Sequence, residues 1–114
     1  MKEFILLIRV PLSYTSEQAA AVNPKWNEVT DKWKADNVFV TSFVFPGLGY
    51  AVSGEDKTAR KEFVVSDQLK MVSTIVLRAE NLETAMAYAN ASPILEYGGS
   101  VELREIQARP AVNN

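Results

Sequence analysis

Much of the usual catalytic chemistry is closed to this chain of 114 residues, because it contains neither histidine nor cysteine. Without histidine there is no Ser-His-Asp triad, no imidazole general base and no histidine-bound metal or haem. Without cysteine there are no disulfides, thiol nucleophiles, cysteine-bound zinc ions or iron–sulfur clusters. The carboxylates show no spacing that marks acid–base work or a metal site, so we expect no metal and no cofactor.

Arg9 is the first candidate for ligand binding. It follows an apolar run and shares a strand face with Ile5 and Leu7. A buried guanidinium must be paired or must bind an anion. Arg9 could therefore hold a ligand carboxylate, or it could bond a neighbouring carboxylate such as Glu102 or Glu105. The sequence favours the ion pair.

Four further side chains could line a binding site. Trp26 either anchors the core or exposes part of its ring in a cleft. Tyr50 could reach over a cleft or across a dimer interface, or lie on the surface of a hairpin. Ser42 and Ser73 interrupt apolar strands, where each hydroxyl serves either as a polar group in a pocket or as a partner of the backbone.

The first helix has a clear beginning and end. Thr15 and Gln18 form a capping-box pattern at its start, and Asn37 can adopt the left-handed conformation that ends a helix. Pro24 predicts a kink or break near residue 23, with the main helix over residues 24–35. One apolar stripe runs along this segment at helical spacing: Val22, Trp26, Val29 and Trp33.

The remaining elements follow from strand and capping patterns. Asn81 caps a second helix, whose inner face we expect to hold Leu82, Ala85, Met86 and Ala89. The expected strands, with a possible short strand or arm at 50–53, cover residues 3–10, 38–45, 62–65, 69–79 and 101–106. Residues 62–79 could form either a hairpin or one bulged strand.

This order predicts an α+β fold of ferredoxin-like topology, an antiparallel sheet with both helices on one face. We expect one domain over residues 1–108 and a tail over 109–114. Residues 3–8 and 38–45 are apolar on both faces, so the second face of the sheet also needs a cover. A second copy is the simplest cover, which predicts a homodimer burying about 1,600 Å² or more through the sheet.

Charge and hydropathy narrow the partners. Apolar residues make up 47% of the chain, charged residues 23%, and the net charge is −2. The basic residues are scattered, which argues against nucleic acid as a partner. The apolar run at the N-terminus is too short for a signal peptide or a membrane span. We therefore expect a cytoplasmic protein with no membrane partner.

The segment over residues 92–106, SPILEYGGSVELREI, resembles the end of YCII-related (DGPF-type) proteins. The start of the chain is also similar, with an M-K-E-F strand, an S-x-E-Q helix start, and Trp26 and Trp33 on the first helix. The resemblance spans nearly the whole chain, and its specific part is the last fifteen residues quoted. It implies a dimeric α+β barrel built from ferredoxin-like units.

Two features of that family are missing from this chain. The place of the Asp-Gly-Pro-Phe motif falls near residues 61–64, Lys-Glu-Phe-Val, which keep none of its turn chemistry. Some members carry an Asp–His pair proposed to be catalytic, and the place of that histidine falls close to Trp26. The resemblance therefore predicts the fold and the pairing, and it does not carry the proposed chemistry over.

Three functions remain open at the level of the sequence. The first is binding of a small anionic or aromatic molecule in a cleft between helices and sheet. The second is a cofactor-free enzyme, of oxygenase or isomerase type, that uses tyrosine, arginine or carboxylate groups. The third is a structural or regulatory dimer with no active site. Fold similarity cannot choose among these, because one scaffold hosts many functions.

Overall fold

Strand β1 (Lys2–Pro11) lies inside the main sheet of the computed structural model, between β6 (Leu69–Ala79) and β7 (Ser100–Ile106). Strand β2 (Phe39–Val44) pairs with the far side of β6 and forms one edge. All these pairs are antiparallel, in the order β2-β6-β1-β7. This is the α+β arrangement, consistent with ferredoxin-like topology, that the sequence predicts.

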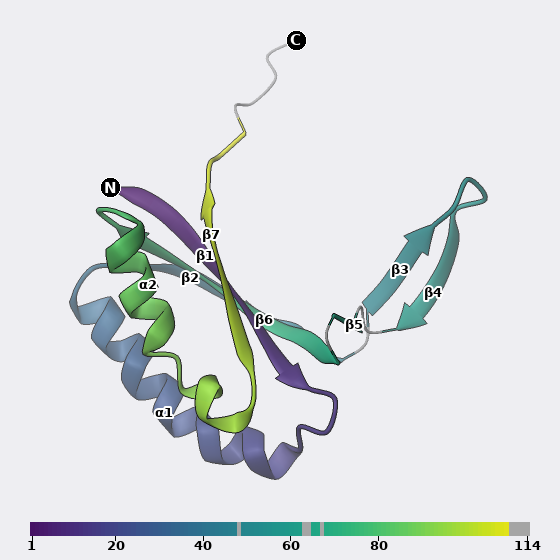
Figure 1. The fold of residues 1–114 in the computed structure, drawn as a ribbon, viewed down its shortest axis with the longest axis horizontal. Coiled ribbons are helices and arrows are strands. Elements are labelled where there is room, and N and C mark those ends of the chain that lie inside the picture. The colour runs from purple at the N-terminus through teal and green to yellow at the C-terminus, as the bar shows by residue number, and fades with distance from the viewer. Residues whose placement is uncertain (48, 63–64, 67, 110–114) are drawn as a thin grey trace.

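The structure describes residues 1–47, 49–62, 65–66 and 68–109. Helix α1 (Ser16–Ala35), helix α2 (Leu82–Asn90) and the short 3₁₀ helix η1 (Pro93–Tyr97) lie on one side of the main sheet (Figure 1). The expected placement of both helices on one face is therefore confirmed.

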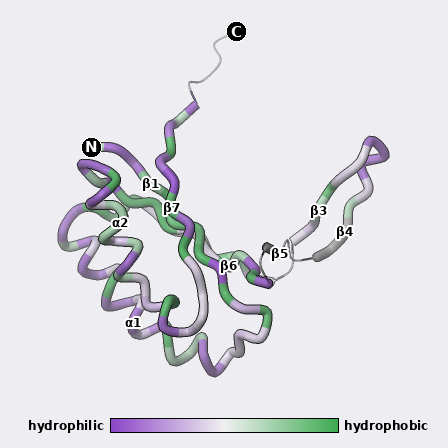
Figure 2. The backbone as a smooth tube through the Cα atoms, in the orientation of Figure 1, coloured by the Kyte–Doolittle hydropathy of each residue, from purple (hydrophilic) through white to green (hydrophobic). Residues whose placement is uncertain are grey.

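Alternate residues of β1 form the centre of the core. Phe4, Leu6, Ile8 and Val10 face the helices and are each at most 1% exposed. Successive side chains of a strand point to opposite faces, so Ile5 and Leu7 face away from the helices. Figure 2 shows hydrophobic segments along β1 and β6, in the middle of the sheet.

The two helices cover this core with different residues. Helix α1 contributes the predicted stripe, with Val22 and Trp33 buried. Helix α2 contributes Ala85 and Ala89, whose small side chains let the helix approach the sheet closely. Two residues expected on the inner face of α2 instead lie near the surface: Leu82 is 58% exposed and Met86 is 44% exposed.

The sequence predicted a kink or a break near residue 23, and the break is wrong, as is the start of the main helix at residue 24. Helix α1 runs without interruption through Pro24, which lies on its exposed side. A proline removes one backbone hydrogen bond and strains the preceding turn. Here the apolar stripe lies on both sides of Pro24, with Val22 buried before it and Trp33 buried after it, so tertiary packing holds the two halves in one helix.

The predicted helix ends are confirmed. The Gln18 backbone N–H donates to Thr15 Oγ1 at 3.1 Å, and the Thr15 N–H donates to Gln18 Oε1 at 2.9 Å. At the other end Asn37 has φ of 60°, the left-handed conformation. Asn81 caps α2 by accepting from the Thr84 N–H at 2.9 Å.

The connection between β2 and β6 carries an inserted hairpin. Strands β3 (Gly49–Ser53) and β4 (Thr58–Glu62) pair only with each other in a separate two-stranded sheet within the described residues. We call residues 49–62 the arm. It leaves the end of the main sheet and stands off from it, on the side opposite the helices (Figure 1).

Strand β5 (Val65–Ser66) then pairs with the start of β6, with Ser66 opposite Leu69. For residues 62–79 the sequence left two alternatives open, a hairpin or one bulged strand. The antiparallel pairing of β5 with β6 shows the hairpin. A bulge does occur in β6, where its register with β1 shifts between Ile8 and Arg9. Residues 63, 64 and 67 of this stretch lie outside the described residues. Two of them, 63 and 64, belong to the place where the family has its Asp-Gly-Pro-Phe motif.

The capping box should stabilise the fold measurably. Thr15→Ala removes the side-chain acceptor for the N–H of Gln18, and we expect the free energy of unfolding to fall by about 1 kcal/mol. Urea denaturation followed by circular dichroism measures this. Ser16→Ala is the matched control, because Ser16 is not part of the capping box. Equal effects of the two substitutions would show that the capping box contributes little.

Candidate ligand-binding pocket

A pocket of about 610 Å³ lies between α1 and the half of the sheet formed by β2 and β6. Its floor includes Ile8 and Val10 of β1 with Val72 and Ile75 of β6. These side chains belong to the core or pack against it. The pocket therefore opens directly onto the hydrophobic core, in the cleft between helix and sheet where the sequence predicts a binding site.

Aromatic side chains form its walls. Trp26 is half-buried and meets the ring of Trp33 edge-to-face, with the ring centres 6.5 Å apart. Trp33 in turn meets Tyr88 of α2 at 6.1 Å. These edge-to-face contacts connect the indole of Trp26 to the core, and the ring also lines the pocket. Phe39 lines the pocket from β2.

A polar stripe of α1 lines the pocket beside the apolar one. Its members are spaced four, three and four residues apart, one position after the residues of the apolar stripe: Asn23, Asn27, Thr30 and Lys34. The Thr30 hydroxyl donates to the backbone carbonyl of Trp26 at 2.9 Å. Lys34 Nζ lies 5.1 Å from the centre of the Phe39 ring, a cation–π contact that holds a positive charge at the pocket.

Ser42 and Ser73 line the pocket from the sheet. The antiparallel register places Val44 opposite Ser73 and Ser42 opposite Ile75, so the two serines come from adjacent strands. Ser42 is exposed and Ser73 is half-buried. The structure thus brings together three of the five predicted site residues, Trp26, Ser42 and Ser73.

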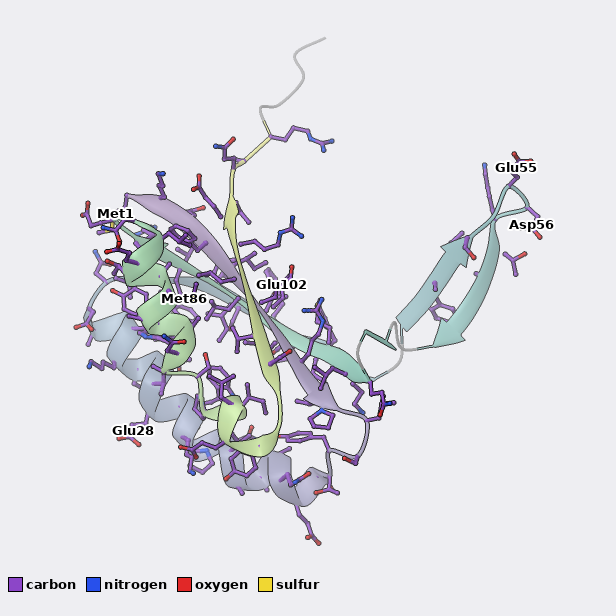
Figure 3. The ribbon with its side chains drawn as sticks, viewed as in Figure 1. Met1, Glu28, Glu55, Asp56, Met86 and Glu102 are labelled. Atoms are coloured by element: carbon purple, nitrogen blue, oxygen red, sulfur yellow. The ribbon has the colours of Figure 1, made fainter. Side chains whose placement is uncertain are left out.

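Arg9 is not at the pocket. It lies on the sheet face away from the helices, where its Nη1 donates to Glu102 Oε1 at 2.8 Å (Figure 3 labels Glu102 on β7). Glu102 also accepts from Arg104 at 3.4 Å. The ion pair that the sequence favoured for Arg9 is confirmed, and its carboxylate is the first of the two candidates.

Tyr50 is also remote from the pocket. It lies on β3 of the arm and is 70% exposed, at a position that the sequence left open among a cleft, a dimer interface and the surface of a hairpin. The arm's tip carries Glu55 and Asp56, which Figure 3 shows far from the body of the protein. The hairpin placement of Tyr50 is confirmed.

Tyr14 lines the end of the pocket that lies near η1, and sequence reasoning missed it. Partial burial raises the pKa of its phenol, and the nearby Tyr97 raises it further. The neighbouring ion pair joins α1 to η1: Lys25 Nζ lies 2.9 Å from Glu96 Oε2 and 5.4 Å from the centre of the Tyr97 ring. The hydrogen bond to Glu96 raises the pKa of Lys25.

The comparisons with known proteins assign no ligand to this pocket. No protein-family model matches the chain, and no curated protein matches it. The resemblance to YCII-related proteins therefore stays a prediction. Within the described part of the chain, no helix is both long and apolar enough to cross a membrane, and no cluster of three or more acidic residues could hold a metal.

The raised pKa of Tyr14 predicts a loss of stability at high pH. A phenol whose pKa is higher in the folded chain than its ordinary value of 10.0 favours folding while it is protonated. This contribution is present below about pH 10 and disappears as the pH rises through the folded pKa. Urea unfolding at about pH 9 and pH 11 should therefore show a smaller loss for Tyr14→Phe than for the wild type.

The pKa of Lys25 is raised as well, but Lys25 is present in both proteins and its effect cancels in the comparison. Equal losses in the two proteins would contradict the assigned environment of Tyr14.

Proposed function

We propose that this protein binds a small aromatic molecule that carries a carboxylate or similar anionic group. The observation that supports the proposal most is the composition of the pocket: an apolar floor, an aromatic wall and one lysine at its side. Ligand sites of small molecules typically combine a concave apolar surface with a few placed polar groups.

Each part of such a ligand has a matching surface. Its ring can lie between Trp26 and Phe39, and its anionic group can face Lys34, with the amides of Asn23 and Asn27 on the same helix. A volume of about 610 Å³ falls within the usual range for small-molecule pockets. Lys34 thus takes the role of anion partner that the sequence considered for Arg9 beside the ion pair.

Binding is favoured over the two alternatives. An open pocket over the core argues against a dimer that has no ligand site. The titratable side chains among the described pocket residues are Tyr14 and Lys34, and burial moves the pKa of Tyr14 further above neutral pH. A phenol that stays protonated donates a hydrogen bond to a ligand and does not accept a proton from it.

The charge requirement can be tested with 1-naphthoate and its neutral analogue 1-naphthamide. Lys34→Gln should weaken naphthoate binding about two- to five-fold, the range for an exposed ion pair of up to about 1 kcal/mol, and should leave naphthamide binding unchanged. Isothermal titration calorimetry gives both dissociation constants. Lys32→Gln is the matched control, because Lys32 is exposed on the same helix and is not among the pocket residues.

The aromatic wall is tested in the same experiment. Trp26→Ala should weaken both ligands about tenfold, since the ring contact is common to them. If both lysine substitutions weakened naphthoate binding equally, the effect would come from the overall charge of the protein and not from a contact with Lys34. Failure of the wild type to bind either probe at millimolar concentration would contradict the proposal.

We further propose that two copies pair through the sheet face that points away from the helices. The middle of this face holds Ile5 and Leu7 of β1 with Val76 of β6, and Phe43 of β2 is 59% exposed beside them. Charged residues lie around it, in the pairs Arg9–Glu102 and Glu3–Arg78 at 2.8 and 4.0 Å. An apolar centre with a polar rim is typical of protein interfaces.

The resemblance to YCII-related proteins supports the same pairing, since it implies a dimeric α+β barrel. A charge in the middle of the face should prevent it, because a buried unpaired charge is costly. Leu7→Glu is therefore expected to turn a dimer into a monomer of 12.7 kDa, measured by sedimentation at micromolar concentration. Leu82→Glu, at an exposed position on helix α2, should leave the dimer intact. A wild type that is monomeric throughout would contradict the pairing.

A further inference from the structure

The arm is poorly supported by its own chain. A two-stranded hairpin is marginally stable in water unless another surface covers it. The main contacts of β3 and β4 are with each other. Figures 1 and 3 show the arm standing away from the body, with Glu55 and Asp56 at its far end. A stable arm therefore needs a further surface that covers it.

The two faces of the arm differ in polarity. Tyr50 and Val52 share one face and are 70% and 63% exposed, and the exposed Ala59 lies directly opposite Val52. The other face carries Ser53 opposite Thr58, and also the half-buried Ala51 opposite Arg60. Residues opposite each other on paired strands point to the same side, so Tyr50, Val52 and Ala59 share one face, and the register partner of Tyr50 is Lys61. We call Tyr50, Val52 and Ala59 the apolar face of the arm.

The position of the arm suggests what covers this face. The arm leaves the main sheet on the side away from the helices, which is also the side of Leu7 and Val76 (Figure 1). A second copy seated on the sheet would therefore lie on the same side as the arm. The proposed sheet interface and the arm would then form one continuous contact surface.

The size of the exposed surface agrees with such a contact. The chain exposes 7994 Å², whereas a compact monomer of its mass exposes about 6,200 Å². Its radius of gyration is 15.9 Å, against about 13 Å for a compact chain of this length. An arm that stands off the body produces an excess of this kind, and the exposed surface leaves room for an interface of standard size, in which each partner buries roughly 800 Å².

We propose that the arm clasps a second copy of this chain, with its apolar face packed against the body of the partner. In a two-fold dimer each subunit then holds the other through its own arm. The inference rests on the pairing proposed above and adds a contact outside the sheet. Tyr50, a predicted site residue, becomes an anchor between subunits, which is the dimer-interface role that the sequence offered it.

The natural absence of cysteine makes the test clean, because a single introduced thiol is the only one in the chain. Val52→Cys puts the thiol on the apolar face, and Ser53→Cys puts a matched thiol on the opposite face of the same strand. Both full-length variants are reacted with a thiol reagent at concentrations above and below the dimer dissociation constant. We expect at least five-fold slower reaction at position 52 in the dimer, and no change at position 53.

A second variant tests the contact through its strength. Tyr50→Ser combined with Val52→Ser should weaken dimerisation about tenfold by sedimentation and leave the circular dichroism spectrum of the monomer unchanged. A stable dimer in which both thiols react equally fast would overturn the role of the arm and leave the sheet pairing standing. Protection at position 52 that persists in the monomer would show that the arm folds onto its own body, which also overturns the inference.

A wild type that is monomeric at every concentration would overturn the pairing and the clasp together. The naphthoate titration, run on the same preparation, reports the pocket separately, so that failure of the dimer and failure of ligand binding can be told apart.

Discussion

The packing of β1 is the constraint on which the other elements depend. Its four inward side chains, from Phe4 to Val10, are almost completely removed from water because the helices cover them. Helix α1 does this with Trp33 and helix α2 with two alanines. The same strand also carries Ile5 and Leu7 on its other face, so one strand defines both the core and the surface we propose for pairing.

The sequence predicted the fold well where local signals and packing agree. The capping box at Thr15, the left-handed Asn37 and the cap at Asn81 each act within a few residues, and each marks an element boundary in the structure. The error at Pro24 has a physical cause. A local rule about one missing hydrogen bond was outweighed by the packing of α1 on the sheet, and single-residue rules cannot weigh such distant contacts.

The pocket was predicted in part, because the sequence pattern shows which residues share a face of a strand or helix but not which faces meet in the fold. Trp26, Ser42 and Ser73 were found as polar or aromatic interruptions of apolar patterns. Arg9 was assigned correctly to the face of Ile5 and Leu7, but strand alternation does not say which face the helices cover. The signal for Lys34 was present as the polar stripe one residue behind the apolar one. Tyr14 lies before the first helix, and only the fold brings it to the pocket.

The order of the strands has a consequence for how this protein folds. Strand β1 pairs with β6 and β7, which lie about 60 and 90 residues further along the chain. Contacts between such distant segments require large loops to close before they contribute stability, and they slow folding relative to helical proteins of equal size. During synthesis β1 is made before its partners β6 and β7, and it must wait for residues as far as Ile106 before both are present. Its exposure in that interval makes the newly made chain a candidate for chaperone binding and for aggregation.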